Sequence, residues 1–144
     1  MFNAFEYFSN IYQSAGINDI YKASGLSNVE ELLANLAGLP DCVMVVRDSG
    51  DGYLNFRDRR LDTAYHSLYI FCKGKFNDHT ANLTAKRTSM AKGIALFALM
   101  KRDAENFGDA AYGFDDFRVD YAEIGPIGKS YFGYAFSFTI EHSF

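Results

Sequence analysis

The sequence contains no tryptophan and only two cysteines among its 144 residues, and no run approaches the ~20 apolar residues of a membrane-spanning helix. The chain also does not open with a positively charged, apolar leader. These absences predict a soluble protein that is made in a cytoplasm and has no membrane partner.

Motifs for catalysis, cofactors and metals are also lacking. None of the three histidines, His66, His79 and His142, belongs to a short metal-binding spacing. No Walker loop, GxGxxG or GxSxG occurs. A catalytic pair of Cys72 and His66 has no supporting feature. We therefore expect no enzymatic activity, no cofactor and no metal.

Two groups of carboxylates fail closer tests. Asp48 and Asp51 lie in a glycine-rich loop, but the loop lacks the D-x-D-x-D-G order and the later glutamate of a calcium site. A solvated hairpin turn is favoured there. Asp115 and Asp116 are adjacent, so on a strand their side chains would point to opposite faces. They are not expected to share an acid–base site.

The charge balance argues against general nucleic-acid binding, because the net charge is −4 and phosphate contacts need basic residues. Basic side chains do gather in two places, a loop and a helical segment. Around a pore they could touch nucleic acid, and on an interface they could pair with acidic neighbours, but a solvated face is favoured. The loop contains Arg57, Arg59 and Arg60, and the segment contains Lys86, Arg87, Lys92, Lys101 and Arg102.

Aromatic residues are abundant, with 14 phenylalanines and 10 tyrosines. That is more ring surface than one small core needs. An aromatic-rich core and an interface rich in tyrosine explain it equally well, because tyrosine buries its ring while its hydroxyl stays wet. The chain length predicts one domain over residues 1–144.

The most pronounced helical pattern covers Asp78 to Phe107. Asn77 or Asp78 can cap its start, and Gly108 can end it in a left-handed conformation. The large apolar residues recur at helical spacing and predict one buried side, which needs a surface to pack on. That side contains Leu83, Met90, Ala91, Ile94, Phe97 and Ala98, while Asn82, Lys86, Ser89 and Lys101 are expected to point elsewhere.

Two shorter helices are predicted before it. A helical stripe of Phe5, Phe8, Ile11, Tyr12 and Ala15 stops at Gly16. Residues 17–26 show no period and read as a linker. A capping box of Ser27 and Glu30 then predicts a helix that buries Val29, Leu32, Leu33 and Leu36 and ends at Gly38 and Pro40.

The middle of the chain predicts three strands. Residues 42–46 form a short apolar run typical of a buried strand. The turn residues 48–52 and the extended residues 53–57 predict a hairpin with it. After a charged loop at 58–62, residues 63–72 are apolar on both sides and are expected inside the sheet. Cys42 and Cys72 both fall in strands, and two buried thiols are favoured over a disulfide.

Two more strands are predicted after the long helix. Residues 116–121 alternate between polar and apolar, and residues 125–128, Gly-Pro-Ile-Gly, turn the chain. Residues 132–140 then alternate strictly between large apolar and small side chains. The small residues, Gly133 to Thr139, predict a close approach of the helix or of a neighbouring subunit.

This order of elements predicts an α+β fold. A mainly antiparallel sheet of about five strands would pack against one long helix, with two shorter helices at the N-terminal side. Residues 1–38 would form the helical part, and residues 40–144 the sheet and the long helix.

Three of these features together resemble the tail-terminator and tail-completion proteins of long-tailed bacteriophages. They are the strand at Val43–Val46 with its hairpin, the helix at 78–107, and the aromatic last strand after the turn, in Gly-Pro-Ile-Gly-Lys-Ser-Tyr-Phe-Gly-Tyr-Ala-Phe-Ser-Phe-Thr-Ile at 125–140. The resemblance covers residues 40–144.

The resemblance implies a virion structural protein that is assembled in the host cytoplasm. Such a protein forms a homo-oligomeric ring, usually a hexamer, at the head-proximal end of the tail. Its partners would be its own copies, the tail tube protein and the head-completion or connector proteins, and DNA would pass through the ring without specific binding.

A ring needs a heterologous interface, which an open sheet edge can supply by pairing strands across subunits. We predict that the hairpin and charged loop at 47–60 make contacts to neighbouring subunits or to the tube, because arginine and aromatic residues are enriched at interface hot spots. The predicted interface residues are Asp48, Asp51, Tyr53, Phe56, Arg57, Arg59 and Arg60.

Two other functions remain open at this point. One is a different phage assembly protein, such as a head–tail connector or a tube-like protein. The other is a small enzyme or ligand-binding α+β protein with a pocket between helix and sheet.

Overall fold

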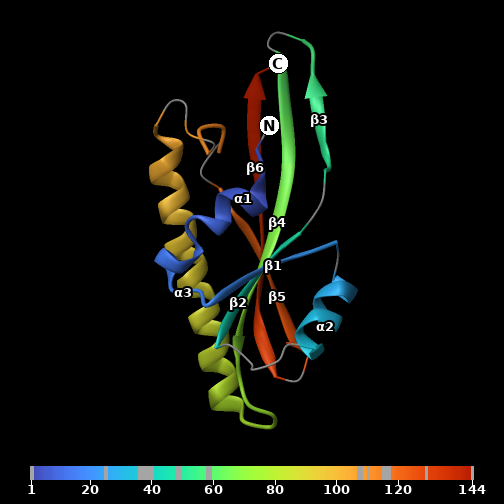
Figure 1. Cartoon of the computed structure of the whole chain (residues 1–144), viewed down its shortest axis with the longest axis vertical. Helices are drawn as coiled ribbons and strands as arrows, with labels where there is room; N and C mark the ends of the chain where they lie inside the picture. The colour runs from blue at the N-terminus through green and yellow to red at the C-terminus, as the bar shows by residue number, and fades with distance from the viewer. Residues whose placement is uncertain are drawn as a thin grey trace.

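The computed structural model describes residues 2–24, 26–35, 41–47, 50–57, 60–106, 109, 111–114, 118–128 and 130–143 (Figure 1). The fold is α+β: a long helix lies along one face of a sheet of six strands, with two short helices and a 3-10 turn. The elements are α1 (Ala4–Ser9), η1 (Tyr12–Ala15), β1 (Asp19–Ala23), α2 (Leu26–Asn35), β2 (Cys42–Arg47), β3 (Gly52–Asn55), β4 (Leu61–Lys73), α3 (His79–Ala104), β5 (Asp120–Ile127) and β6 (Tyr131–Ser143).

The centre of the sheet is the long antiparallel pair of β4 and β6, in register from Leu61 opposite Ser143 to Lys73 opposite Tyr131. The strand order is β1-β2-β4-β6-β5, and β3 pairs with β4 on the same side as β2. The predictions of an interior strand at 63–72 and of an alternating last strand are therefore confirmed.

The N-terminal part contains a strand that the sequence did not indicate. Residues 17–26 were expected to be a linker, but β1 pairs in parallel with β2, from Asp19 opposite Val43 to Ala23 opposite Arg47. The linker prediction is wrong, and residues 1–38 are not purely helical. Five residues are too short to show a period, and the free edge of β2 supplies the hydrogen bonds that make this segment a strand.

The predicted hairpin between residues 42–46 and 53–57 is also wrong. β2 pairs with one end of β4, where Val46 lies opposite Leu68, and β3 pairs with the other end, where Gly52 lies opposite Ala64. The hairpin is therefore formed by β3 and β4. β4 is long enough to hold two shorter strands end to end, and strand pairing of this kind is not visible in local sequence.

The long helix begins and ends close to the predicted residues. Asp78 caps it by accepting a hydrogen bond from the amide of Ala81 at 3.0 Å, and its last residue is Ala104. The predicted end at Phe107 and Gly108 lies outside the described residues. The predicted buried side is partly wrong, because Leu83 and Ile94 are exposed by 37% and 65% whereas Ser89 is fully buried.

The side of α3 that faces the sheet is built instead from small residues with large ones at its end. Gly93 lies directly over the ring of Phe136, where a Cβ atom would clash, and Ser89 donates a hydrogen bond from Oγ to the carbonyl of Ile70 at 2.7 Å. A sheet lined with phenylalanine rings leaves no room for large helix side chains at closest approach. The buried residues of this side are Ala85, Ser89, Gly93, Leu96, Phe97, Met100 and Ala104.

The expected close approach to the small residues of β6 occurs at Gly133. The hydroxyl of Ser89 lies 2.9 Å from the position that a Cβ of Gly133 would occupy. The other large part of the interface is aromatic, because Phe97 of α3 contacts the rings of Phe136 and Phe138 at centroid distances of 5.7 and 5.4 Å.

The opposite face of the sheet is covered by α2 over part of its length. α2 begins at Leu26. The predicted capping box depends on the side chain of Ser27, which lies outside the described part of the structure. Val29 and Leu33 are buried as predicted, while Leu36, Gly38 and Pro40 lie outside the described residues. The cluster under α2 also contains Val43, Val45, Tyr69, Phe71, Ile127 and Tyr131.

The two cysteines form a disulfide, which corrects the expectation of two free thiols. Cys42 of β2 lies directly opposite Cys72 of β4, with their Cα atoms 4.2 Å apart and both side chains buried. Their separation of 30 residues in sequence gives no sign of this register.

The ends of several other elements differ from the predicted ones. Gly16 ends a helical segment in a left-handed conformation as predicted, but the segment is divided into α1 and η1. Gly125 and Pro126 do not form the turn before the last strand; they lie within β5 at a register shift, and the turn follows at Gly128, whose φ is 61°. In the predicted strand at 116–121, residues 116–117 lie outside the described residues, and β5 begins at Asp120.

Candidate interaction surface

One end of the sheet extends beyond α2 and β2 (Figure 1). We call this end the arm; it consists of the described residues of the β3–β4 hairpin (51–57 and 60–66) and residues 138–143 of β6. Within it β3 pairs with β4, and β4 pairs with β6. Every residue of β3 is exposed. Phe138 and Ile140 of the arm are buried in the core that packs with α3, so the exposed part of the arm is chiefly β3 and Tyr65.

The structure brings the described residues of the predicted interface together in the β3–β4 hairpin. Asp51 precedes β3, Tyr53 lies in it, Phe56 and Arg57 follow it, and Arg60 precedes β4. All five are exposed, with Tyr53 at 50% and Phe56 at 67%. The side chain of Asn55 accepts a hydrogen bond from the amide of Arg57 at 3.0 Å, which shapes the turn after β3. Asp48 and Arg59 lie outside the described residues.

Two further apolar residues belong to this surface and were missed. Tyr65 of β4 is 47% exposed, and its ring centroid lies 6.1 Å from that of Tyr53. Leu54 is 55% exposed and points to the other side of β3. The sequence placed Tyr65 in an interior strand, where burial was expected.

The backbone of β3 adds a second feature. Among the described strands β3 pairs only with β4, so its other edge presents amide and carbonyl groups that no described strand satisfies. A free edge with exposed aromatic side chains is a template for pairing with another extended chain.

A polar cleft of about 460 Å³ adjoins the arm on the face of the sheet opposite α3. Arg118 and Asp120 on its rim form a hydrogen-bonded ion pair with Nε 3.1 Å from Oδ1, and both side chains are largely exposed. Mixed charges and hydroxyls suit a polar partner better than an apolar ligand. The cleft is lined by Arg47, Asp51, Tyr65, His66, Ser67, Arg118, Asp120, Ser137, Phe138 and Thr139.

On the α3 side of the arm, His66 and His142 are packed close to the N-terminal segment. The ring centroid of Phe2 lies 5.1 Å from that of His66, and the buried Nε2 atoms of both histidines have no hydrogen-bond partner among the described residues. Burial lowers the pKa of both imidazoles, and nearby Asp62 opposes this shift. Neutral, partly covered histidines here are elements of packing.

The described residues form neither a Cys72–His66 catalytic pair nor a group of metal ligands. Cys72 is consumed by the disulfide, so it cannot act as a nucleophile with His66. Across the described ranges, no three histidine, cysteine, aspartate or glutamate side chains converge closely enough to hold a metal ion.

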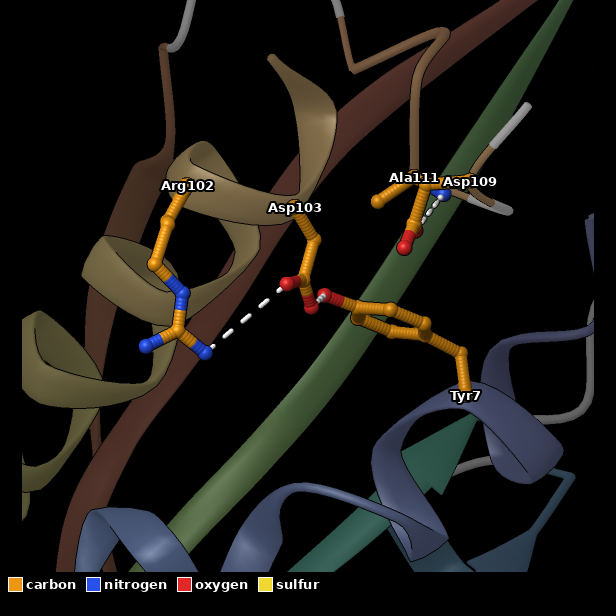
Figure 2. Close-up of polar contacts among 5 residues, drawn as sticks. All are labelled: Tyr7, Arg102, Asp103, Asp109 and Ala111. Carbon is orange, nitrogen blue, oxygen red and sulfur yellow. Dashed lines mark hydrogen bonds and ion pairs between the residues drawn. The ribbon is translucent and has the colours of Figure 1, made fainter. Parts of the chain in front are cut away.

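A polar contact joins α1 to the end of α3 (Figure 2). The hydroxyl of Tyr7 donates to Oδ2 of Asp103 at 2.7 Å, and Oδ1 of Asp103 lies 3.8 Å from an amino nitrogen of Arg102. Burial, and then the carboxylate of Asp103, raise the pKa of Tyr7. A hydroxyl that stays protonated is suited to holding the two helices together and not to proton transfer.

Comparisons with known proteins give no further guide to this surface. No model of a known protein family matches the sequence, and no curated protein matches it. In the part of the chain that the structure describes, no helix has the length and apolar character needed to cross a membrane.

Proposed function

We propose that this protein is a phage tail terminator that assembles as a ring, caps the tail tube and joins it to the head-completion proteins. The observation that carries the proposal is the arm, where an open strand edge and exposed aromatic and arginine side chains lie on one hairpin. Under this proposal the protein belongs to the virion, at the head-proximal end of the tail.

The arm has the composition expected of an assembly contact. Tyr53, Phe56 and Tyr65 offer ring surface at small entropic cost, and Arg57 and Arg60 add donors for carboxylates on a partner. The free edge of β3 can take a strand from a neighbouring subunit or from the tube, with backbone hydrogen bonds giving affinity. A contact of the arm with a different surface of the next copy would be heterologous, which is what a ring requires.

The test combines native mass spectrometry with negative-stain images, first of the protein alone and then with tail tubes added. We expect closed rings, sixfold in the family that the sequence resembles, that bind the tube end and stop its growth. A variant with Phe56→Ala and Arg57→Ala should lose tube capping, whereas Phe76→Ala, which removes an even more exposed ring outside the arm, should not. Capping that survives the arm variant would contradict the proposal.

Rings that ignore tail tubes would favour a head–tail connector or a tube-like assembly protein. The polar cleft beside the arm supports a different second candidate, a ligand-binding protein. The cleft has a volume of about 460 Å³ and is lined by Arg47, Asp51 and Tyr65 among others. A monomer that ignores tubes and whose melting temperature rises with a polar small molecule would favour that candidate.

A further inference from the structure

Helix α3 is apolar on two sides, and only one of them faces the sheet. The inner side packs on β4 and β6 through the small and large residues already described. The outer side carries the other stripe that the sequence pattern shows, with Leu83, Ala91, Ile94 and Ala98 all exposed. A helix on the surface of a globular domain normally has one apolar stripe.

The outer stripe is continuous. Leu83, Arg87, Ala91, Ile94 and Ala98 follow one another at steps of three or four residues, which places them along one line of the helix. Ile94 at its centre is 65% exposed, and the alanines beside it would let another backbone approach closely. We call this surface the outer stripe. An apolar centre with a charged rim is the usual anatomy of a protein–protein contact.

The charge of α3 indicates what kind of surface it fits. The helix contains five basic residues and one acidic residue, a balance of +4, so with a total of −4 the rest of the chain carries −8. Lys86 is held by Glu123, and Lys92 donates to the carbonyl of Gly16, so these two lie at the flanks. Arg87, Lys101 and Arg102 are exposed along the stripe and beyond its end.

Nucleic acid is a poor occupant of such a surface, because Ile94 and the alanines offer nothing to a phosphate at its centre. An acidic protein surface that also has apolar patches fits better, and the remainder of this chain is acidic. Helix α2 has that character: Glu30, Glu31 and Ala34 are exposed, and no residue of α2 is basic. A second copy of the chain therefore offers a surface of complementary charge.

We propose that the outer stripe of α3 docks against α2 of a second copy of this protein. The two helices lie on opposite faces of the sheet (Figure 1), so one copy would use α3 and the next α2. Such a head-to-tail contact repeats from copy to copy and produces a ring or a filament. The inference rests on the proposed assembly function and deepens it, because it specifies which surfaces pair between neighbouring copies.

The first experiment measures self-association by sedimentation velocity and native mass spectrometry over a wide concentration range. Ile94→Glu places a carboxylate at the centre of the stripe and is expected to weaken self-association at least about tenfold, a change of roughly 1.4 kcal/mol. Phe76→Glu is the matched control, because Phe76 is 79% exposed and lies just before α3. Circular dichroism would verify that both variants keep their fold.

The second experiment identifies α2 as the partner surface. Arg87→Glu and Glu30→Arg should each weaken self-association, and the two changes in one chain should restore it, since every head-to-tail contact then regains an opposite-charge pair. Zero-length carboxyl–amine crosslinking of the wild-type oligomer should join lysines of α3 to glutamates of α2 between copies.

Several outcomes would overturn the inference. The first is that the wild-type protein stays monomeric, both alone and with tail tubes. The second is that Ile94→Glu leaves self-association unchanged, or that the double charge exchange does not restore it. The third is that the outer stripe binds duplex DNA and the protein does not self-associate. The two proposals can also fail separately. Oligomers that depend on the stripe but do not cap tubes would overturn only the terminator function, and capping rings that tolerate Ile94→Glu would overturn only this contact.

Discussion

The two ends of the same sheet differ sharply in how they are covered. At the end where α2 and α3 face each other across the sheet, Val43, Ile70 and Phe71 are completely buried, and a disulfide joins β2 to β4. In the arm the same strand β4 continues, but Tyr65 is exposed and β3 beside it is exposed throughout. The difference lies in the layers that cover the strands and not in the strands themselves.

The two ends of β4 therefore differ in what they contribute: the covered end contributes to stability, and the arm offers side chains to a partner. Apolar area removed from water stabilises the covered end, whereas the arm leaves comparable side chains exposed and so available to a partner. Local stability is expected to follow the same gradient, with the covered end opening only on global unfolding. Substitutions that change one end should therefore leave the other largely unaffected.

The largest effect is expected from Phe71→Ala at the covered end. Phe71 is fully buried in the cluster under α2, and its ring centroid lies 5.8 Å from that of Tyr69, so its removal leaves a cavity and should cost about 3–5 kcal/mol of unfolding free energy. The matched change in the arm, Phe56→Ala, should stay within about 0.5 kcal/mol. Urea unfolding followed by circular dichroism measures both, and equal losses would erase the contrast.

Removing the disulfide should produce the next largest effect. The bond between Cys42 and Cys72 spans 30 residues, and closing such a loop limits the unfolded chain, so Cys42→Ala with Cys72→Ala should cost about 2–4 kcal/mol. The wild-type protein in reductant serves as the control and should lose a similar amount. Unchanged urea midpoints in both samples would show that the bond contributes little.

A smaller effect is expected where α3 meets the sheet. Gly93→Val drives a branched side chain into the ring of Phe136 and should cost about 1–3 kcal/mol. Ala91→Val, two residues earlier on the exposed outer stripe, should cost only the helix propensity difference of about 0.5 kcal/mol. If the two variants unfold alike in urea, the assignment of inner and outer sides is wrong.

The pH dependence of stability should be the mildest difference and should come from the arm. Burial lowers the pKa of His66 and His142 in the folded state, so below about pH 6.5 the unfolded chain binds more protons. Above that pH both histidines are neutral in the folded and the unfolded state, so their titration does not change the free energy of unfolding. As the pH falls through the unfolded pKa and then the folded pKa, the free energy of unfolding decreases. His66→Gln with His142→Gln should flatten the change in urea midpoint between neutral pH and about pH 5; an unaltered slope would contradict this.

Much of the fold follows from periodicity in the sequence. The alternation of β6, the apolar run of β2 and the cap at Asp78 all predict the observed elements, because each pattern has one dominant local solution. The residues that composition predicts to form an interface lie in the β3–β4 hairpin, and the structure gathers the described ones on one exposed arm. Tyr65 was missed because exposure depends on where neighbouring layers end.

The wrong predictions share one cause, which is that pairing partners are distant in the sequence. β1 is a strand because β2 has a free edge, Cys42 meets Cys72 because of strand register, and α3 turns its small residues inward because Phe136 and Phe138 line the sheet. Local spacing favoured the larger apolar residues of α3, which left Leu83 and Ile94 outside.

The sequence by itself therefore determined most of the helices and strands, with β1 as the exception, that the fold is α+β, and that aromatic and basic residues gather at 53–60. Only the tertiary structure decided which strand pairs with which, which side of α3 is buried, and that the two cysteines meet. Local patterns reflect interactions between neighbours in the chain, whereas register and layer coverage depend on contacts across the whole sheet.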